Sequence, residues 1–174
     1  MPKVREWKDP DDGERRGSVP RRPAEDLKAL ASLFARTDRL LAQWSCAGSG
    51  ECCQLSRTGL EPFLFPIEVR ALEAALGAQA RPWPAARADG ACPFLDASGR
   101  RCSVYAARPF GCRTYFCSRL SAPRAYPNAS VEALNAALTQ LSDRLDEGAA
   151  PRAMSEIASQ RAGRADERGD LTST

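Results

Sequence analysis

The chain has 174 residues, which suits one domain with appendages better than two full domains. Its 25 basic and 22 acidic side chains give a net charge of +3, without the strong basic excess typical of nucleic-acid-binding proteins. No stretch approaches the roughly 20 apolar residues that span a bilayer. Neither nucleic acid nor a membrane is therefore an expected partner. The many alanines and arginines are typical of a GC-rich, bacterial genome.

The two ends of the chain differ in composition from its middle. Residues 1–22 combine charges of both signs with prolines and few large apolar groups, which predicts a disordered tail. This N-terminus lacks the apolar region of a secretory signal, so we expect the cytoplasm, where thiols stay reduced. Residues 148–174 are small and polar and predict a second disordered tail. The expected domain is residues 23–147.

Three amphipathic segments lie within this domain. Apolar residues recur at helical spacing over 23–44, and leucines recur at intervals of three and four residues after Ser130. Between these two segments, Pro66 suits the first turn of a helix that Gly77 ends, with Glu68 complementing its N-terminal dipole. Residues 60–65 are strand-like. We therefore expect a small α-rich fold, with about three helices around an irregular, loop-built cysteine metal core and at most a short strand pair.

Seven cysteines lie in the middle of the chain, and the chain has no histidine. In a reducing compartment such a cluster indicates metal ligands or redox groups more than disulfides. Without imidazole, a metal site must use thiolate, with a carboxylate or water as the remaining candidates. Soft thiolates select zinc, copper(I) or iron–sulfur clusters over magnesium or calcium. The predicted metal ligands are Cys46, Cys52, Cys53, Cys92, Cys102, Cys112 and Cys117.

The first cysteine group reads C-A-G-S-G-E-C-C from Cys46 to Cys53. Its two glycines permit a sharp turn that lets Cys46 face Cys52 or Cys53. Adjacent residues of an extended segment point to opposite sides, so we expect Cys52 and Cys53 to play different roles. Three isolated carboxylates, Glu51, Glu61 and Asp96, are expected to be solvated, and Glu51 is the only one close enough to the cysteines to be a spare ligand.

These motifs resemble the YkgJ-type cysteine-cluster family, a zinc- or iron-chelating domain named for its CxxCxxCC motif. The resemblance rests on Cys46 to Cys53, on C-P-F-L from Cys92, on C-S-V-Y-A-A-R-P-F-G-C-R from Cys102, and on Cys117. At Ser49 the chain departs from the motif, which would place a cysteine there. The resemblance implies metal chelation, with zinc and iron, including an iron–sulfur cluster, as the candidate cofactors. A more distant similarity to flagellin lysine N-methylases, which are iron–sulfur dependent, suggests an enzyme.

Three further residues of the motif are expected to surround the metal ligands: Tyr105, Arg108 and Arg113. An arginine beside thiolates offsets their charge and could hold an anion, but it could equally satisfy loop carbonyls. The function predicted is chelation of zinc or iron by an all-cysteine centre, with a protein or peptide as the expected partner. The alternatives are an iron–sulfur enzyme that modifies a peptide or protein, and a thiol redox or metal-trafficking protein. Whether the domain is an enzyme stays open at this stage.

Overall fold

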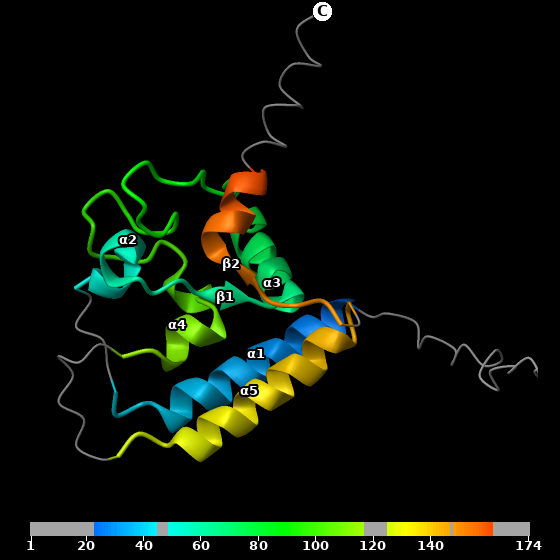
Figure 1. Ribbon diagram of the computed structural model, residues 1–174. Coiled ribbons are helices and arrows are strands. Elements are labelled where there is room, and N and C mark those ends of the chain that lie inside the picture. Colours follow the sequence, from blue (N-terminus) through cyan, green and yellow to red (C-terminus); the bar gives the residue numbers. More distant parts are fainter. Residues whose placement is uncertain (1–22, 45–48, 117–124, 147, 162–174) are drawn as a thin grey trace, which may run out of the picture.

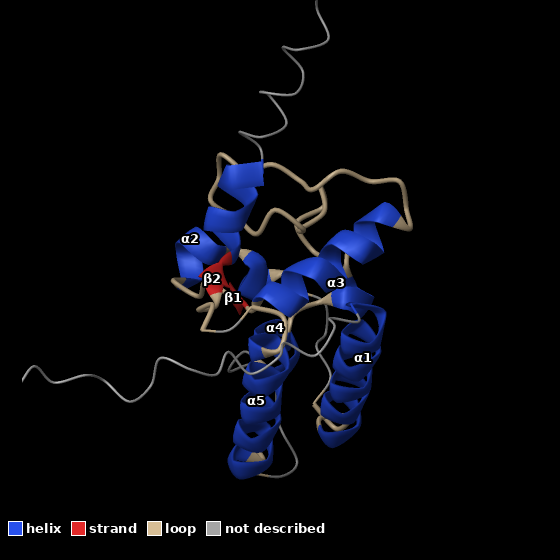
Figure 2. Cartoon of the chain, turned by 90° about the vertical axis from the view of Figure 1, so that its right-hand side faces the viewer, coloured by secondary structure: helices blue, strands red, loops and turns tan. Residues whose placement is uncertain are grey.

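The computed structural model describes residues 23–44, 49–116, 125–146 and 148–161. Helices dominate this part of the chain, and the sheet found in it has only two short strands (Figure 2). The small α-rich fold expected from the sequence is thereby confirmed. The helices are α1 (Pro23–Leu40), α2 (Leu55–Thr58), α3 (Pro66–Gly77), α4 (Phe110–Thr114) and α5 (Asn128–Asp143), with 3₁₀ turns η1 (Glu51–Cys53) and η2 (Tyr105–Ala107) and strands β1 (Phe63–Leu64) and β2 (Arg152–Ala153).

Helices α1 and α5 pack against each other in antiparallel orientation along one side of the molecule (Figure 1). Their apolar stripes form one hydrophobic core together with the first turns of α3 and α4. The buried members of this core are Leu30, Leu33, Phe34, Ile67, Phe110, Leu134, Leu138, Leu141 and Leu145. Of these four helices, only α4 carries a cysteine. The pair α1–α5 therefore contacts the cysteine region through α3 and α4.

A second hydrophobic core lies among the cysteine-bearing loops. Helix α3 belongs to both cores, because Ile67 packs in the first and Leu72 and Leu76 pack in the second. Around these two leucines gather Leu55, Leu64, Ala91, Cys92, Phe94, Leu95, Val104, Met154 and Ile157. The cysteine region therefore has an apolar core of its own in addition to its thiols.

The C-terminal segment corrects one expectation. We expected disorder from Gly148, but β2 pairs antiparallel with β1, and residues 154–161 are helical. Three residues of this helix, Met154, Ile157 and Ala158, are at most 4% exposed. Their spacing is helical, but they are only three apolar residues within an otherwise polar stretch. So short a pattern does not distinguish a helix from a disordered tail in the sequence. Residues 1–22 and 162–174, which we also expected to be disordered, lie outside the described residues.

Polar contacts fix this helix at both ends. At its start, the Ser155 N–H donates to the Glu61 carboxylate at 2.9 Å. At its end, Arg161 pairs with Glu73 of α3 and lies over the Trp83 ring, 4.7 Å from the ring centroid. Glu61 is thus a helix-capping residue and not the isolated carboxylate that we expected. No helix among the described residues is long and apolar enough to cross a membrane.

We predict that Met154→Ala lowers the free energy of unfolding by about 2–4 kcal/mol, since it empties a fully buried position of the second core. Gln160→Ala, on the exposed side of the same helix, is the control and should change stability by less than about 0.5 kcal/mol. Chemical denaturation of both variants measures the difference. Equal effects would show that this segment does not contribute to the core.

Candidate metal centre

Cys52 and Cys53 lie together on η1, and their sulfur atoms are 3.9 Å apart. Both line the same cavity. The expectation that they point to opposite sides was wrong, because it assumed an extended backbone. In a 3₁₀ turn, successive side chains are separated by about 120° and not by about 180°. The two thiols can therefore bind the same metal ion.

Gly50 sets the position of this turn. It has φ of 71°, in the left-handed region, and caps the start of η1. A Cβ atom at Gly50 would overlap the carbonyl oxygen of Gly99, in the loop between Cys92 and Cys102. Only glycine therefore permits both the turn and the close approach of the two cysteine loops.

The loop between Cys92 and Cys102 is a tight hairpin organised by Asp96. Its carboxylate accepts hydrogen bonds from the Ser98 hydroxyl and from the backbone N–H groups of Arg100 and Arg101. These bonds, first of all the one from Ser98, hold the Asp96 pKa below its usual value. Asp96 is thus a structural residue of the hairpin and not the isolated carboxylate that we expected.

Backbone hydrogen bonds join the two cysteine segments. The Cys92 N–H donates to the Cys53 carbonyl oxygen at 2.8 Å. A second bond, from the Ser56 N–H to the Gly90 carbonyl, reinforces the contact. The main chain therefore places Cys92 beside Cys53.

Cys112 comes from the short helix α4, whose start is held by the buried carboxylate of Glu68. One Glu68 oxygen accepts the Phe110 N–H at 2.6 Å, and the other accepts the Phe65 N–H at the start of α3 at 2.9 Å. Glu68 is 2% exposed. Burial raises its pKa to about 7, although both N–H bonds and nearby Arg113 oppose the shift. We had expected only a helix-dipole role for this residue, since its contact with Phe110 spans distant parts of the sequence.

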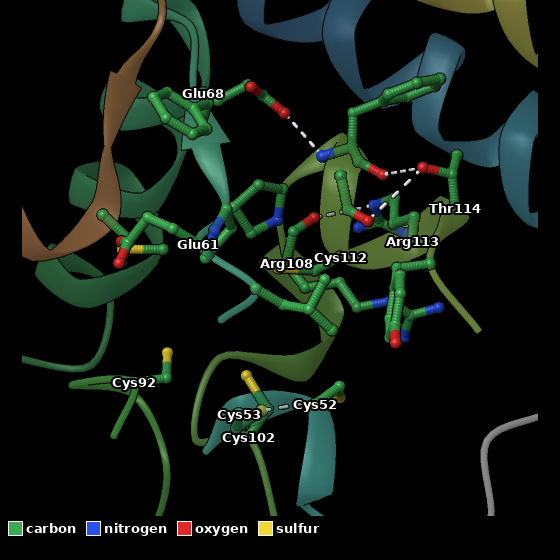
Figure 3. Close-up of a pocket in the computed structure, with 18 of the residues that line it drawn as sticks. Cys52, Cys53, Glu61, Glu68, Cys92, Cys102, Arg108, Cys112, Arg113 and Thr114 are labelled. Carbon is green, nitrogen blue, oxygen red and sulfur yellow. Dashed lines mark hydrogen bonds between the residues drawn. The ribbon is translucent and has the colours of Figure 1, made fainter. Parts of the chain in front are cut away.

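All five described cysteines line one cavity of about 820 Å³: Cys52, Cys53, Cys92, Cys102 and Cys112. Cys53 and Cys92 direct their sulfur atoms into the same space from two different segments, with Glu68 on the far side of the pocket (Figure 3). Cys46 and Cys117 lie outside the described residues. Their near neighbours in the sequence, Trp44 and Phe116, line this cavity.

The two arginines of the motif differ in their surroundings. The guanidinium of Arg113 is 4% exposed and donates to the carbonyl oxygens of Arg108 and Ala106 and, at 2.6 Å, to Asp38 of α1. Arg113 therefore fastens the loop before α4 onto α1. Arg108 instead lies over the Tyr105 ring, 3.9 Å from its centroid, and comes only within 3.6 Å of Asp38. No local sequence signal indicated Asp38, which contacts these arginines across the fold.

The protein environment favours the neutral form of several of these thiols. Burial raises the pKa of Cys112 to about 12, and that of Cys102 also rises. A hydrogen bond with Cys52 lowers the Cys53 pKa, but the neighbouring Cys92 thiol and burial outweigh it and raise the value to about 12. The hydrogen bond with Cys53, followed by burial, raises the Cys52 pKa well above its ordinary value. A bound cation would reverse this preference, since it stabilises thiolate.

The donor set fits a thiophilic metal. Tetrahedral zinc with Zn–S bonds of about 2.3 Å places neighbouring sulfurs about 3.8 Å apart, close to the 3.9 Å between Cys52 and Cys53. Among the described residues, no three Cys, Asp or Glu side chains already have the arrangement of a metal site. A complete site therefore requires a shift of the surrounding thiols or ligands from outside the described part.

We predict that Gly50→Ala destabilises the domain by about 1–3 kcal/mol more than Gly59→Ala does. Both glycines have positive φ, 71° and 65°, so both variants bear a similar backbone strain. A Cβ at Gly59 meets no atom within 4 Å, which makes this variant a matched control for the overlap with Gly99. The measurement is denaturant unfolding, and equal losses would contradict the close approach of the two loops.

A second prediction concerns pH. Because the folded-state pKa of Glu68 is raised from 4.5 to about 7, folded protein binds more protons than unfolded protein between these values. The contribution of Glu68 to the free energy of unfolding is therefore largest below about pH 4.5 and falls by up to about 3 kcal/mol as the pH rises through 7. Glu68→Gln should remove this dependence, whatever its effect on absolute stability. Unfolding curves of both proteins from pH 5 to 8 test it, and parallel pH profiles would refute it.

Comparison with known proteins identifies the family. A family model, CxxCxxCC, described as "Putative zinc- or iron-chelating domain", matches residues 45–136, more than half of the chain. A search of curated proteins and a search of solved structures found no match. The matched region contains all seven cysteines and the cavity-lining arginines. The chain therefore belongs to the CxxCxxCC family, and metal binding is the general function that this membership supports.

Proposed function

We propose that this protein binds zinc or iron through thiolates of its cysteine cluster. The observation that carries the proposal is the convergence of five free thiols, from η1, the Cys92–Cys102 hairpin and α4, on one cavity. The five ligands proposed are Cys52, Cys53, Cys92, Cys102 and Cys112, with Cys46 and Cys117 as further ligands. When bound, the metal neutralises thiolate charge in a site that is otherwise unfavourable for it.

The chemistry of the ligands limits the metal. Thiolates without imidazole suit zinc or an iron–sulfur cluster, both of which accept four cysteines. Several thiols here are protonated at neutral pH before the metal binds, so binding releases protons and weakens as the pH falls. A reducing compartment, such as the cytoplasm, would keep the thiols available.

An enzymatic function is the second candidate, with a peptide or protein as substrate. Two observations favour it: the chain has more cysteines than one tetrahedral ion requires, and the cavity is far larger than an ion. An iron–sulfur cluster in such a cavity would have room for a substrate beside it. A purely structural zinc site is closed and would leave this space without a role.

We predict that Cys102→Ser and Cys112→Ser each lose most of the bound metal and unfold the cysteine region, because a serine hydroxyl does not form the soft anionic ligand. Ser103→Ala, next to Cys102, should keep its metal content. Protein purified without oxygen is assayed for zinc, iron and inorganic sulfide, with an absorption spectrum and circular dichroism. Iron with sulfide would favour the enzyme, and zinc alone would favour a structural or chelating site. If both cysteine variants keep full metal content and native melting, the proposed ligand set is wrong.

A further inference from the structure

The cavity has room for an organic molecule as well as a metal. Its volume of about 820 Å³ falls within the range of roughly 300–1,000 Å³ typical of small-molecule sites, which are mostly apolar with a few polar groups. Away from the thiols its lining is rich in aromatic and proline side chains. The metal site alone does not account for this part of the cavity.

Three exposed aromatic side chains line this same cavity. Phe63, Tyr105 and Tyr115 are 57%, 53% and 42% exposed, the highest values for large apolar residues in the described part of the chain. They come from β1, η2 and the residue after α4, so three separate segments bring exposed aromatic rings to the lining of one cavity. Exposed apolar groups gathered in this way mark a binding surface more often than chance exposure does.

Arg108 provides a charged group in the aromatic wall, the part of the cavity lined by Phe63, Tyr105 and Tyr115. Its guanidinium lies over the Tyr105 ring, its side chain is 18% exposed, and it lines the cavity. Among the described residues the Arg108 guanidinium has no hydrogen-bond partner, since its closest approach to Asp38 is 3.6 Å. Within this part of the chain, its N–H groups are therefore available to an anion in the cavity.

Three charged side chains lie together beside the Tyr105 ring: Arg108, Arg113 and Asp38. Arg108 and Arg113 share the single carboxylate of Asp38, and Arg113 takes the short contact. Within this group of three, the positive charges exceed the negative charge by one. The other charged residues of the lining, Glu61, Glu68 and Glu132, are acidic, so Arg108 is the place in the cavity where an anion is favoured, and a more highly charged ligand such as a phosphate dianion is disfavoured. The two oxygens of a carboxylate can accept two parallel N–H bonds from a planar guanidinium.

We propose that this wall binds an organic carboxylic acid with an apolar body. The carboxylate accepts hydrogen bonds from Arg108, and the apolar body packs on Tyr105 and the neighbouring rings. The inference goes beyond metal binding and holds whichever metal the thiols take. The carboxylate would lie beside the cysteines, because Arg108 is close enough to Cys52 and Cys102 to act on both electrostatically.

Calorimetric titration of the full-length protein, at matched metal content, tests the proposal with three probes. We expect 3-phenylpropionate to bind at least roughly tenfold more tightly than 3-phenylpropionamide, its neutral isostere, and than acetate, which lacks the apolar body. Arg108→Gln should reduce the affinity for the acid to that of the amide. Arg57→Gln, exposed on α2 and outside the cavity, is the matched control and should bind like the unmodified protein.

Equal affinity of the unmodified protein for acid and amide, or for acid and acetate, would overturn the proposal. So would an Arg108→Gln variant that still prefers the acid. If that variant loses its metal or unfolds, Arg108→Lys decides the matter, because it keeps the charge beside the thiols without the planar fork. Weakened acid binding with retained metal then supports the proposal, and unchanged acid binding refutes it.

Discussion

The buried guanidinium of Arg113 is the interaction on which the arrangement of the cavity depends. It joins Asp38 of α1 to two carbonyl oxygens of the loop that precedes α4, and it lies over the Phe34 ring, 4.2 Å from the centroid. A buried arginine is stable only when its donors are satisfied, so the loop must adopt one conformation to satisfy them. That conformation places Cys112 and Arg108 at the cavity. This side chain thereby couples α1 to the loop that precedes α4.

The cavity lies where the two hydrophobic cores meet. Phe65, Phe110 and Leu138 belong to or pack on the core of α1 and α5, and Phe94 and Val104 belong to the core of the cysteine loops; all five line the cavity. Regular secondary structure is sparse around the thiols, and specific bonds replace it. Asp96 closes one hairpin, Gly50 admits a close backbone approach, and Glu68 connects the starts of α3 and α4. These contacts place the loops that carry the thiols around one cavity.

The sequence predicted those features that depend on local patterns. Pro66 and Gly77 mark the ends of α3 because the covalent structure of each residue restricts or frees the backbone there. The cysteine grouping and motif led to the family, which the family model confirms. The contacts of Asp38 and Glu68 join residues far apart in the chain, and no spacing rule indicates them. The shared orientation of Cys52 and Cys53 depends on a 3₁₀ turn of three residues, too short for periodicity to reveal.

The position of Met154 has a consequence for the order in which the protein can assemble. This side chain belongs to the core of the cysteine loops, yet it follows all seven cysteines in the sequence. Since synthesis proceeds from the N-terminus, every thiol leaves the ribosome before the segment that pairs with β1 and completes their core. The nascent chain therefore passes through a stage in which its cysteines are all made but their core is still open. A metal ion captured at that stage would be held by the cysteine loops alone. Release of the metal from the folded protein would require these loops to move within a completed hydrophobic core.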